Sequence, residues 1–459
     1  MPRREYRIGS HSLDEVQRNP GLASANSSAD PGLRFASSGY LRWPKLPRGT
    51  PMSATTGAAD DDRTRRISIG FLNFAHAVDH YVMLIFPTVV IGLVVIYQRS
   101  YDDLLFLATA SFFAFGIFSL PAGWLADHWS RRNMMAVFYF GCGVSLIGAA
   151  FAPSLTMLAV ALFVLGIFAA IYHPVATAMV VALATHRGRT LALNGVCGNL
   201  GVALAAGITA ALTAWVGWRG AFLVPAVVCI ATGIAYLALV PADRANTAGR
   251  SSVPDVRLAT WLAATVFGLF VLIAITAGLV FNTVTIALPK VVDERLGFNI
   301  SLVAVGGIAT AVFLCGAVAQ FTIGRILEKY PPHLVFAAVA LLQFVGVVWV
   351  AYATGSVLLV ALAVAMAAIY AQVTVNDFVI ARYTADAWRA RIYAVRYFVT
   401  YVISGAAAWM ISSLYGRGGF DLVLTVTAVV ALGFVIGTVL IAVLVHGVER
   451  HRGIVQPAE

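Results

Sequence analysis

Apolar runs of about twenty or more residues, separated by short polar segments, follow one another along the chain from Ile67 to His446. A helix of about 20 residues crosses a hydrocarbon core of roughly 30 Å, so each run is long enough to span a membrane. Transmembrane strands are only about ten residues long and alternate in polarity, which these runs do not. The pattern predicts twelve helical spans: 70–96, 104–125, 133–152, 155–184, 190–214, 219–240, 260–289, 300–324, 333–353, 356–381, 392–415 and 420–446.

Composition indicates the same class. Apolar residues make up 60% of the chain and charged residues 11%, with a mean hydropathy of +0.85. A soluble domain carries about 25% charged residues. The net charge of +10 would suggest nucleic acid in a soluble protein. Here the basic residues lie in short loops between spans, so we expect the lipid bilayer as the surrounding partner and no nucleic acid. The four cysteines lie inside apolar segments, as packing residues do.

The distribution of Lys and Arg predicts the topology. Counting alternate loops places seventeen of these residues beside the spans on one side and five on the other, namely Arg99, Arg219, Lys290, Arg295 and Arg417. Cytoplasmic loops carry the excess of positive charge. We therefore expect a multi-pass protein of the cell (inner) membrane with both termini in the cytoplasm.

The two ends of the chain differ from the spans. The first 66 residues are rich in Pro, Gly, Ser and Arg and lack the apolar run of a signal peptide, so we expect them to be disordered. Met52 is an alternative start. The predicted organisation is a disordered cytoplasmic segment (1–66), an N-terminal six-helix bundle (67–240), a cytoplasmic central loop (241–257), a C-terminal six-helix bundle (258–447) and a cytoplasmic tail (448–459).

Short patterns repeat in the same order in the two halves. Pro87-Thr-Val-Val returns as Pro289-Lys-Val-Val, and Gly123-x-x-x-Asp127 returns as Gly324-x-x-x-Glu328. Three more pairs keep the offset between 198 and 202 residues: Ala170-Ile-Tyr172 with Ala368-Ile-Tyr370, Arg189 with Arg391, and Gly220-Ala-Phe222 with Gly418-Gly-Phe420. Five ordered matches indicate an internal duplication. Two parallel six-helix repeats are a transporter plan, with the binding site between the halves near the midplane.

One loop motif points to a family. The segment after the second span reads Gly123-Trp-Leu-Ala-Asp127-His-Trp-Ser-Arg131-Arg132. It resembles the Gly-x-x-x-Asp signature, followed by basic residues, of the major facilitator superfamily, and the resemblance covers all twelve spans. It implies an all-α membrane protein with two pseudo-symmetric bundles of six helices. The glycine permits close helix approach, and the aspartate can cap a helix end or pair with arginine.

Within that superfamily, the first half is most similar to the fosmidomycin-resistance group of proton-driven exporters. Three segments carry the similarity: His76-Ala-Val-Asp79-His80, Tyr172-His173-Pro174 and Gly198-Asn199-Leu200-Gly201. Two positions depart from it. The group has an acid where this chain has Val175, and a Gly-Pro pair where it has Ala205-Ala206. Both departures argue against assigning export.

The first span carries three ionisable residues, His76, Asp79 and His80, whose spacings of three and four place them on one helical face. At about 1.5 Å per residue from Ile67, Asp79 lies roughly 18 Å deep, close to the midplane. An ionisable residue there costs roughly 2.5–3.5 kcal/mol on insertion scales. A carboxylate beside imidazoles can exchange protons in the physiological range. These residues predict a proton-coupling site. The alternative is a closed polar network that ties the span to its neighbours.

Four more residues are candidates for a substrate cavity: Tyr172, His173, Asn282 and Tyr370. The resemblance implies that the first and fourth spans face the cavity. His173 precedes Pro174, which removes a backbone hydrogen bond and can bend the helix. A lone buried histidine is equally consistent with packing. The repeat places Asn282 opposite His80 and Tyr370 opposite Tyr172, and uncharged groups there suit hydrogen bonds to a substrate.

The cytoplasmic ends of the spans carry a predicted gate, with Gly123, Asp127, Arg131 and Arg132 in the first half and Gly324, Glu328, Asp377 and Arg391 in the second. In an outward-open state we expect the two Gly-x-x-x-acid loops to meet the ends of the eleventh and fifth spans, near Arg391 and Arg189. We expect Asp377 to join an ion-pair network with Arg382, Arg391, Arg396 or Lys329.

These observations favour a secondary active transporter of a small organic solute, proton-coupled and working by alternating access between two bundles. The sequence contains no nucleophile–base pair and no metal-ligand spacing, so we predict no enzyme activity, no catalytic residue and no metal. We expect no cofactor, since an ion gradient would drive transport, and a monomer. The alternative is a transporter-like membrane sensor or assembly protein without flux. Retention of the polar first span and the loop motif argues against it.

Overall fold

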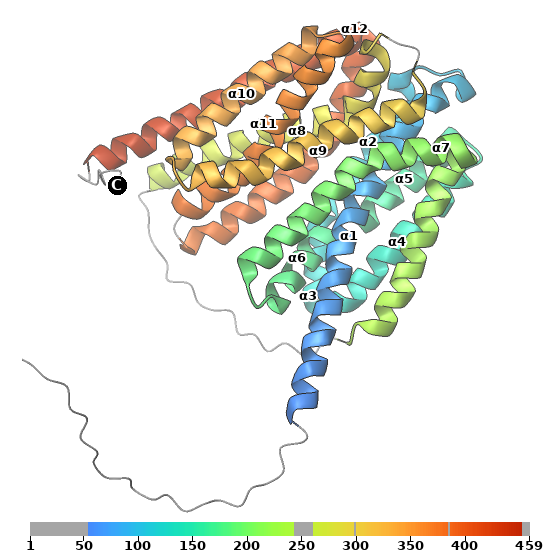
Figure 1. The fold of residues 1–459 in the computed structure, drawn as a ribbon, viewed down its shortest axis with the longest axis horizontal. Coiled ribbons are helices and arrows are strands. Elements are labelled where there is room, and N and C mark those ends of the chain that lie inside the picture. The colour runs from blue at the N-terminus through green and yellow to red at the C-terminus, as the bar shows by residue number, and fades with distance from the viewer. Residues whose placement is uncertain (1–53, 243–259, 298–299, 384–385, 452–459) are drawn as a thin grey trace, which may run out of the picture. The chain divides into compact units, whose positions relative to one another are not determined.

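The computed structural model describes residues 54–242, 260–297, 300–383 and 386–451, and this part of the chain is helical without any strand (Figure 1). The chain divides into two units, Met1–Ser53 and Ala54–Glu459, of which the first lies outside the described residues. The helices are α1 (Ala54–Tyr97), α2 (Tyr101–Ile117), α3 (Ser119–His128), α4 (Arg131–Ala150), α5 (Leu155–Ala169), α6 (Tyr172–Leu183), α7 (Arg187–Leu239), α8 (Thr260–Arg295), α9 (Leu302–Leu327), α10 (Pro332–Tyr352), α11 (Gly355–Tyr383) and α12 (Asp386–His451).

Among the described residues, nine helical stretches are long and apolar enough to cross a membrane, or ten if α2 and α3, bent by 40°, form one broken span.

Two of these stretches are twice as long as one span requires, with 52 residues in Gly188–Leu239 and 49 in Phe398–His446. Gly217 interrupts α7 and Gly418 with Gly419 interrupts α12, each with non-helical backbone. Figure 1 shows α7 turning back on itself. At about 1.5 Å per residue, each stretch is long enough for two crossings of a roughly 30 Å core. Counted in this way, the described chain contains the twelve predicted spans, and the predicted fold class is confirmed.

The first helix begins earlier than predicted. It starts at Ala54. Asp62 forms ion pairs with Arg65 and Arg66, one turn further along, and the Arg66 Nη2 atom lies 2.6 Å from Asp62 Oδ2. Oppositely charged residues spaced by three and four stabilise an exposed helix. The predicted disorder is therefore wrong for residues 54–66. The remainder of that segment, most of the predicted central loop and the last residues of the tail lie outside the described residues.

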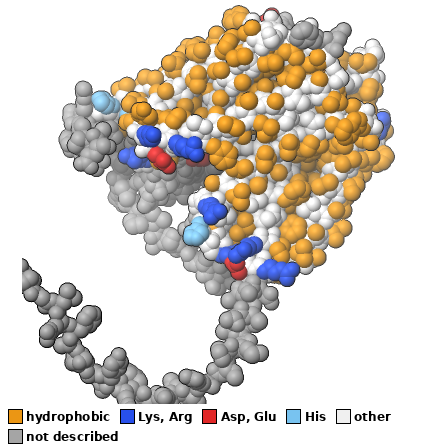
Figure 2. All heavy atoms as spheres, viewed as in Figure 1, with side chains coloured by type: hydrophobic (Ala, Val, Ile, Leu, Met, Phe, Trp, Pro, Cys, Tyr) orange, Lys and Arg blue, Asp and Glu red, His pale blue; other side chains and the backbone are white. Residues whose placement is uncertain are grey.

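The outer surface is apolar. Figure 2 shows hydrophobic side chains over most of one face. Large exposed side chains of this kind include Phe151, Trp215, Val318, Phe321 and Val429. A soluble protein rarely exposes so large an apolar area, whereas the hydrocarbon of a membrane accommodates it.

Most of the Lys and Arg side chains visible on the face in Figure 2 gather at one end of the helices. We call it the basic end. Its exposed residues include Arg66, Arg189, Arg325, Lys329 and Arg382. These residues come from loops and helix ends of both halves, so the positive charge that the sequence assigns to one side lies together in the fold.

The two halves meet mainly along two helix pairs, α2 with α12 and α7 with α9, with smaller contacts of α1 to α8 and α9. Glycines bring the backbones close: a Cβ on Gly116 would lie 2.5 Å from the Val402 nitrogen, and one on Gly306 would lie 2.6 Å from the Ala206 oxygen. Between α2 and α12 these contacts run from Asp102 beside Gly416, far from the basic end, to Gly116. At the basic end α3 packs mainly on α2, α4 and α6 of its own half.

Candidate functional site

A fully buried carboxylate lies at the centre of the first span. Asp79 is 18 residues from either end of the membrane-length stretch Asp61–Tyr97 and has no exposed surface. Among the described residues, neither of its carboxylate oxygens has a hydrogen-bond partner. Buried polar groups are nearly always hydrogen-bonded, so an unsatisfied carboxylate indicates a functional position.

His76 and His80 lie beside Asp79 on the same face of α1, as their spacing predicts. Their ring centroids are 5.0 Å apart. The His76 Nδ1 atom is 2.7 Å from the Asn194 carbonyl oxygen of α7, and the ring stacks on Tyr172 with 4.8 Å between centroids. The position of the His76 ring is therefore fixed by two other spans.

His173 joins this group from α6. α5 and α6 form one membrane-length stretch, Leu155–Leu183, with α-helical backbone angles at the junction Ala170–Ile171. Pro174 has no N–H to donate to the preceding turn, so one helical hydrogen bond is missing there. The His173 Nε2 atom lies 3.3 Å from Asp79 Oδ2, close but not aligned for a hydrogen bond. Its ring centroid is 5.3 Å from that of His76 and 5.4 Å from that of His80. We call His76, Asp79, His80 and His173 the midplane cluster. The structure thus unites His173, which the sequence leaves separate, with the predicted proton-coupling residues.

The midplane cluster also contacts the second half of the chain. Tyr401 of α12 lies nearly parallel to His173, with 4.7 Å between centroids and 30° between planes. Phe115 of α2 packs against both rings, at 5.9 Å from His173 and 5.2 Å from Tyr401. Sequence reasoning missed Tyr401, because no pattern in α12 distinguishes it from other aromatic residues of the spans.

A shell of amides and glycines supports the cluster. The Asn194 side-chain amide donates to Tyr172 Oη (2.9 Å) and to Asn73 Oδ1 (3.1 Å). On α7, a Cβ on Gly198 would lie 2.5 Å from His76 Nε2, and one on Gly201 would lie 2.2 Å from the Ala77 oxygen. The Gly198-x-x-Gly201 pattern gives a signal for this packing, whereas Asn194 has none in the sequence.

The other predicted cavity residues lie in two places. Tyr172 is fully buried, stacks on His76, and donates its hydroxyl to the Leu72 carbonyl (3.1 Å). In the second half, Asn282 donates its side-chain amide to the Gly278 carbonyl of its own helix (2.8 Å). Tyr370 is also buried and packs on Phe281 with 6.0 Å between centroids. Of the four, Tyr172 and His173 therefore contact the predicted coupling residues, and Asn282 and Tyr370 lie in the other bundle.

The first-half gate residues are engaged with one another and with neighbouring helices. A Cβ on Gly123 would lie 3.1 Å from Pro174 Cβ, so α3 and α6 approach closely there. Arg131 donates to Asp127 Oδ1 at 2.8 Å. Arg132 donates to the carbonyls of Leu237 (2.6 Å) and Val240 (3.0 Å) at the end of α7. The motif thus binds α3, α4, α6 and the end of α7 into one unit.

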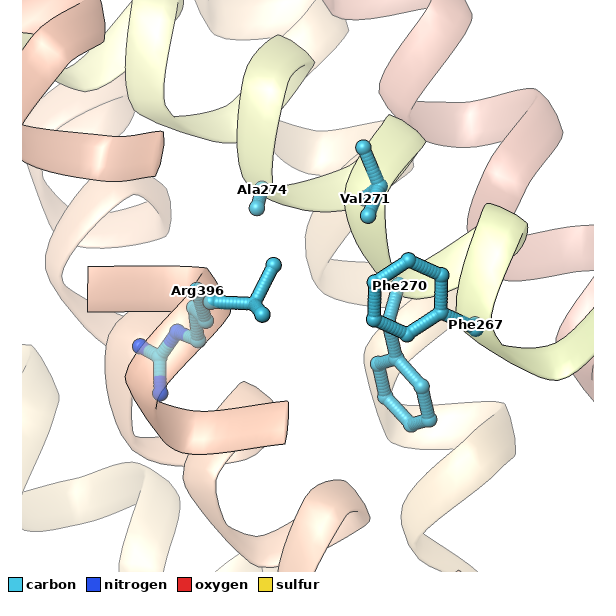
Figure 3. Close-up of a pocket in the computed structure, with 6 residues that line it drawn as sticks. Phe267, Phe270, Val271, Ala274 and Arg396 are labelled. Atoms are coloured by element: carbon cyan, nitrogen blue, oxygen red, sulfur yellow. The ribbon is translucent and has the colours of Figure 1, made fainter. Parts of the chain in front are cut away.

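The second-half gate residues are arranged differently. A Cβ on Gly324 would meet no other part of the described chain within 4 Å, and Glu328 is exposed at the end of α9 without an ion-pair partner among the described residues. Asp377 pairs with Arg396, one of its predicted partners. Figure 3 shows Arg396 on α12 across from Phe267 and Phe270 of α8, beside a small cavity. The side chain of Arg391 lies outside the described residues.

Comparison with known proteins identifies the family. Residues 69–313 match the family model of the Major Facilitator Superfamily, and the chain belongs to this superfamily. It is therefore a multi-pass membrane protein of a transporter superfamily.

Individual proteins are more distant. The chain is 28% identical over 228 residues to a chloramphenicol resistance protein of Streptomyces lividans, a match of 48% of this chain and 56% of that relative's length. Among solved structures it resembles a bacterial homologue of the human lysosomal transporter Spinster in an inward-facing, unoccupied conformation (TM-score 0.66, 13% identity, 83% of this chain and 95% of that one). It also resembles a D-xylose–proton symporter (TM-score 0.64, 15% identity, 80% and 96%). At these identities the structural likeness shows the fold.

Proposed function

We propose that this chain couples proton movement to the transport of a small organic solute by alternating access, with the midplane cluster as the proton site. The observation that carries the proposal is that His173 contacts Asp79 in the first half and Tyr401 in the second. A proton gained or lost at the cluster changes the charge on a ring that lies against the other bundle. The cluster is thus placed to link protonation to the relative position of the two halves.

The driving force is sufficient for accumulation. One proton moving down a membrane potential of 100 mV gains about 2.3 kcal/mol. That free energy corresponds to a concentration ratio of about 50, since each 1.4 kcal/mol is roughly tenfold. Imidazoles exchange protons near neutral pH, which matches such a role.

The positive-inside rule supports a cytoplasmic basic end, with both termini of the chain in the cytoplasm of a cell membrane. The contacts between α2 and α12 lie between the midplane and the opposite end. From this position of the contacts we infer a state open toward the cytoplasm. Alternating access then requires the contacts of Gly116 and Gly306 to separate while the loops at the basic end come together.

The nature of the solute is supported by two similarities. The first half resembles the fosmidomycin-resistance group, and one matched relative is named for chloramphenicol resistance. Both concern small organic molecules. We infer a solute of that size class, with Tyr172 as support for the cluster and Asn282 and Tyr370 as hydrogen-bonding candidates in the second half.

Purified full-length protein in proteoliposomes tests the proposal. A thermal-shift screen of metabolites and antibiotics first identifies a ligand, because a bound ligand stabilises the folded protein. Under an imposed pH gradient, we expect the wild type to accumulate that ligand and Asp79→Asn only to equilibrate it, with ligand binding retained. His128→Ala, which replaces an exposed histidine on α3, is the control and should transport normally. Full accumulation by Asp79→Asn would refute the coupling role. A ligand that binds but is never transported would favour the sensor alternative.

A further inference from the structure

We propose that the midplane cluster is a binding site for one divalent transition-metal ion of the zinc class, with His76, His80 and His173 as nitrogen ligands and Asp79 as the oxygen ligand. This inference goes beyond the proposed function and does not depend on transport, because occupancy can be measured on protein at rest. From the sequence we predict no metal, and the sequence does not show that His173, separated from the other ligands by more than 90 residues, lies beside them.

The donor set fits this class of ion. One ligand atom from each of the three histidines lies within 4.8 Å of the others. The Oδ2 atom of Asp79 lies 3.3 Å from the Nε2 atom of His173. Three imidazoles and a carboxylate suit Zn²⁺, Co²⁺ and Ni²⁺, whereas Ca²⁺ and Mg²⁺ prefer sites made only of oxygen atoms.

The ring positions match a tetrahedral site. With a metal–nitrogen bond of about 2.0–2.1 Å, each ring centroid lies roughly 3.2 Å from the ion, so centroids in a tetrahedral arrangement are about 5.2 Å apart. The three observed centroid separations are 5.0, 5.3 and 5.4 Å. The ligand nitrogens of a closed site would be about 3.4 Å apart. Ligation therefore requires the rings to turn while α1 and α6 keep their spacing.

The hydrogen bond of His76 selects the tautomer that a metal requires. A carbonyl oxygen can only accept, so the Nδ1 atom facing the Asn194 oxygen at 2.7 Å carries the proton. In the neutral ring the lone pair is then on Nε2. Metal-bound histidines commonly donate their other nitrogen to a backbone carbonyl in this way.

Gly198 leaves that lone pair free. A Cβ at this position would be 2.5, 2.6 and 2.7 Å from Nε2, Cε1 and Cδ2 of His76. Nearly equal distances to three ring atoms place the glycine over the face of the ring. The lone pair lies in the ring plane, so α7 does not cover it.

The cluster contains the unsatisfied atoms that an ion would complete. Among the described residues, both Asp79 oxygens and His173 Nε2 are buried without a hydrogen-bond partner. Buried groups of this kind call for a ligand, and a cation coordinated by all of them would supply one.

Binding of Co²⁺ to the full-length protein tests the site. The protein is purified in detergent with a tag that contains no histidine. Tetrahedral Co²⁺ gives strong visible absorption, and Zn²⁺ should displace it. We expect one ion per chain, no competition by Mg²⁺, and at least tenfold weaker binding by His173→Ala. The double variant His128→Ala/His186→Ala, which removes exposed histidines, is the matched control and should bind as the wild type does.

A second variant separates ligation from folding. His173→Cys replaces the imidazole by a thiolate, which also binds these ions, so it should retain binding and add a sulfur-to-cobalt charge-transfer band. Absence of saturable Co²⁺ binding by the wild type would overturn the proposal. So would unchanged binding by His173→Ala, or no new band with folded His173→Cys. Loss of binding in the His128→Ala/His186→Ala control would assign the ion to the surface.

The outcome is distinguishable from that of the proposed function. If the cluster binds no metal but Asp79→Asn abolishes pH-driven accumulation, the metal site fails and the proton site stands. If cobalt binds with the expected pattern and Asp79→Asn transports normally, the reverse holds.

Discussion

The same helix pair is packed in opposite ways in the two halves of the molecule. In the first half, α7 contributes the small residues, and Gly198 and Gly201 lie against His76 and Ala77 of α1. In the second half, the offset of 202 residues makes Gly278 the counterpart of His76, and here α8 contributes the glycine, which lies against Thr400 and Ile403 of α12. Either helix of the pair can carry the glycines, and in both cases the two helices remain close together. Only the first arrangement leaves room for an imidazole on the first helix of the pair.

The ionisable residues of the midplane cluster also have no counterpart in the second half. At the repeat positions of Asp79 and His173, the second half has Phe281 and Ala371. Phe281 packs on Tyr370, while the equivalent Tyr172 stacks on His76. Duplication therefore preserved the helices, whereas the ionisable groups are found in one half and the aromatic partner Tyr401 is supplied by the other.

The largest effect we expect comes from closing the glycine contact of the first half. In Gly201→Ala, the new Cβ would lie 2.2 Å from the backbone oxygen of Ala77, and backbone cannot rotate away. The two helices must separate, at a cost of about 3 kcal/mol in the free energy of unfolding. Thermal unfolding of the purified protein in detergent, or loss of folded protein after purification, measures it.

Gly278→Ala is the matched control in the second half. Its Cβ would lie 3.6 Å from Ile403 Cγ2, an ordinary contact. The higher helix propensity of alanine, about 0.5–1 kcal/mol, should leave this variant neutral or slightly more stable. Equal destabilisation by the two substitutions would show that the opposite packing of the halves does not affect the free energy of unfolding.

A smaller difference is expected between the two repeated tyrosines. The Tyr172 hydroxyl donates to the Leu72 carbonyl and accepts from Asn194, whereas the Tyr370 hydroxyl is buried without a hydrogen-bond partner among the described residues. Tyr172→Phe leaves buried groups unsatisfied and should cost about 1–3 kcal/mol. Tyr370→Phe removes an unsatisfied group and should be neutral or stabilising. The unfolding midpoints of the two variants compare them directly. A larger loss in Tyr370→Phe would mean that its hydroxyl has a bound partner, such as a substrate or water.

The fold could be predicted almost completely from the sequence. Apolar length, the bias of Lys and Arg and the constant offset of the repeats depend on the bilayer thickness and on duplication, which act on every span alike. The prediction failed at residues 54–66, where local ion pairs of Asp62 with Arg65 and Arg66 extend a helix through a polar composition.

The site could be predicted only where it is local in sequence. Three residues on one turn of α1 follow from helical spacing, but the position of His173 beside them depends on how α6 packs on α1. Asn194 and Tyr401 contact the cluster through tertiary packing alone. Their residue types are common in transmembrane helices, so no pattern marks them.

The loops at the basic end extend the difference between the halves. Gly123 is packed against Pro174, and Asp127 and Arg132 hold partners in their own half. Gly324 and Glu328, at the corresponding positions, have neither a close contact nor an ion pair among the described residues. The repeated Gly-x-x-x-acid sequence therefore does not have the same contacts in this arrangement.

The smallest effect is expected from the acids of these loops. Asp127 is 61% exposed and pairs with Arg131 one turn away, and such pairs contribute under about 1 kcal/mol. From the sequence we expect Asp127 to gain partners when the loops meet. Replacing Asp127 should therefore disfavour the state in which the loops meet and shift the population a few-fold toward the arrangement open at the basic end.

Labelling of Leu191→Cys, near the beginning of α7, reports the shift in a background with Cys197 and Cys315 replaced by alanine. Asp127→Ala should increase labelling and lower turnover with ligand binding unchanged, while Glu328→Ala, which loses no ion pair among the described residues, should have a smaller effect on both. If Asp127→Ala changes neither labelling nor turnover, the loop is only a topological anchor. If Glu328→Ala has the same effect as Asp127→Ala, both loops help to close the basic end. The difference between the contacts of the two loops is then a feature of the present conformation alone.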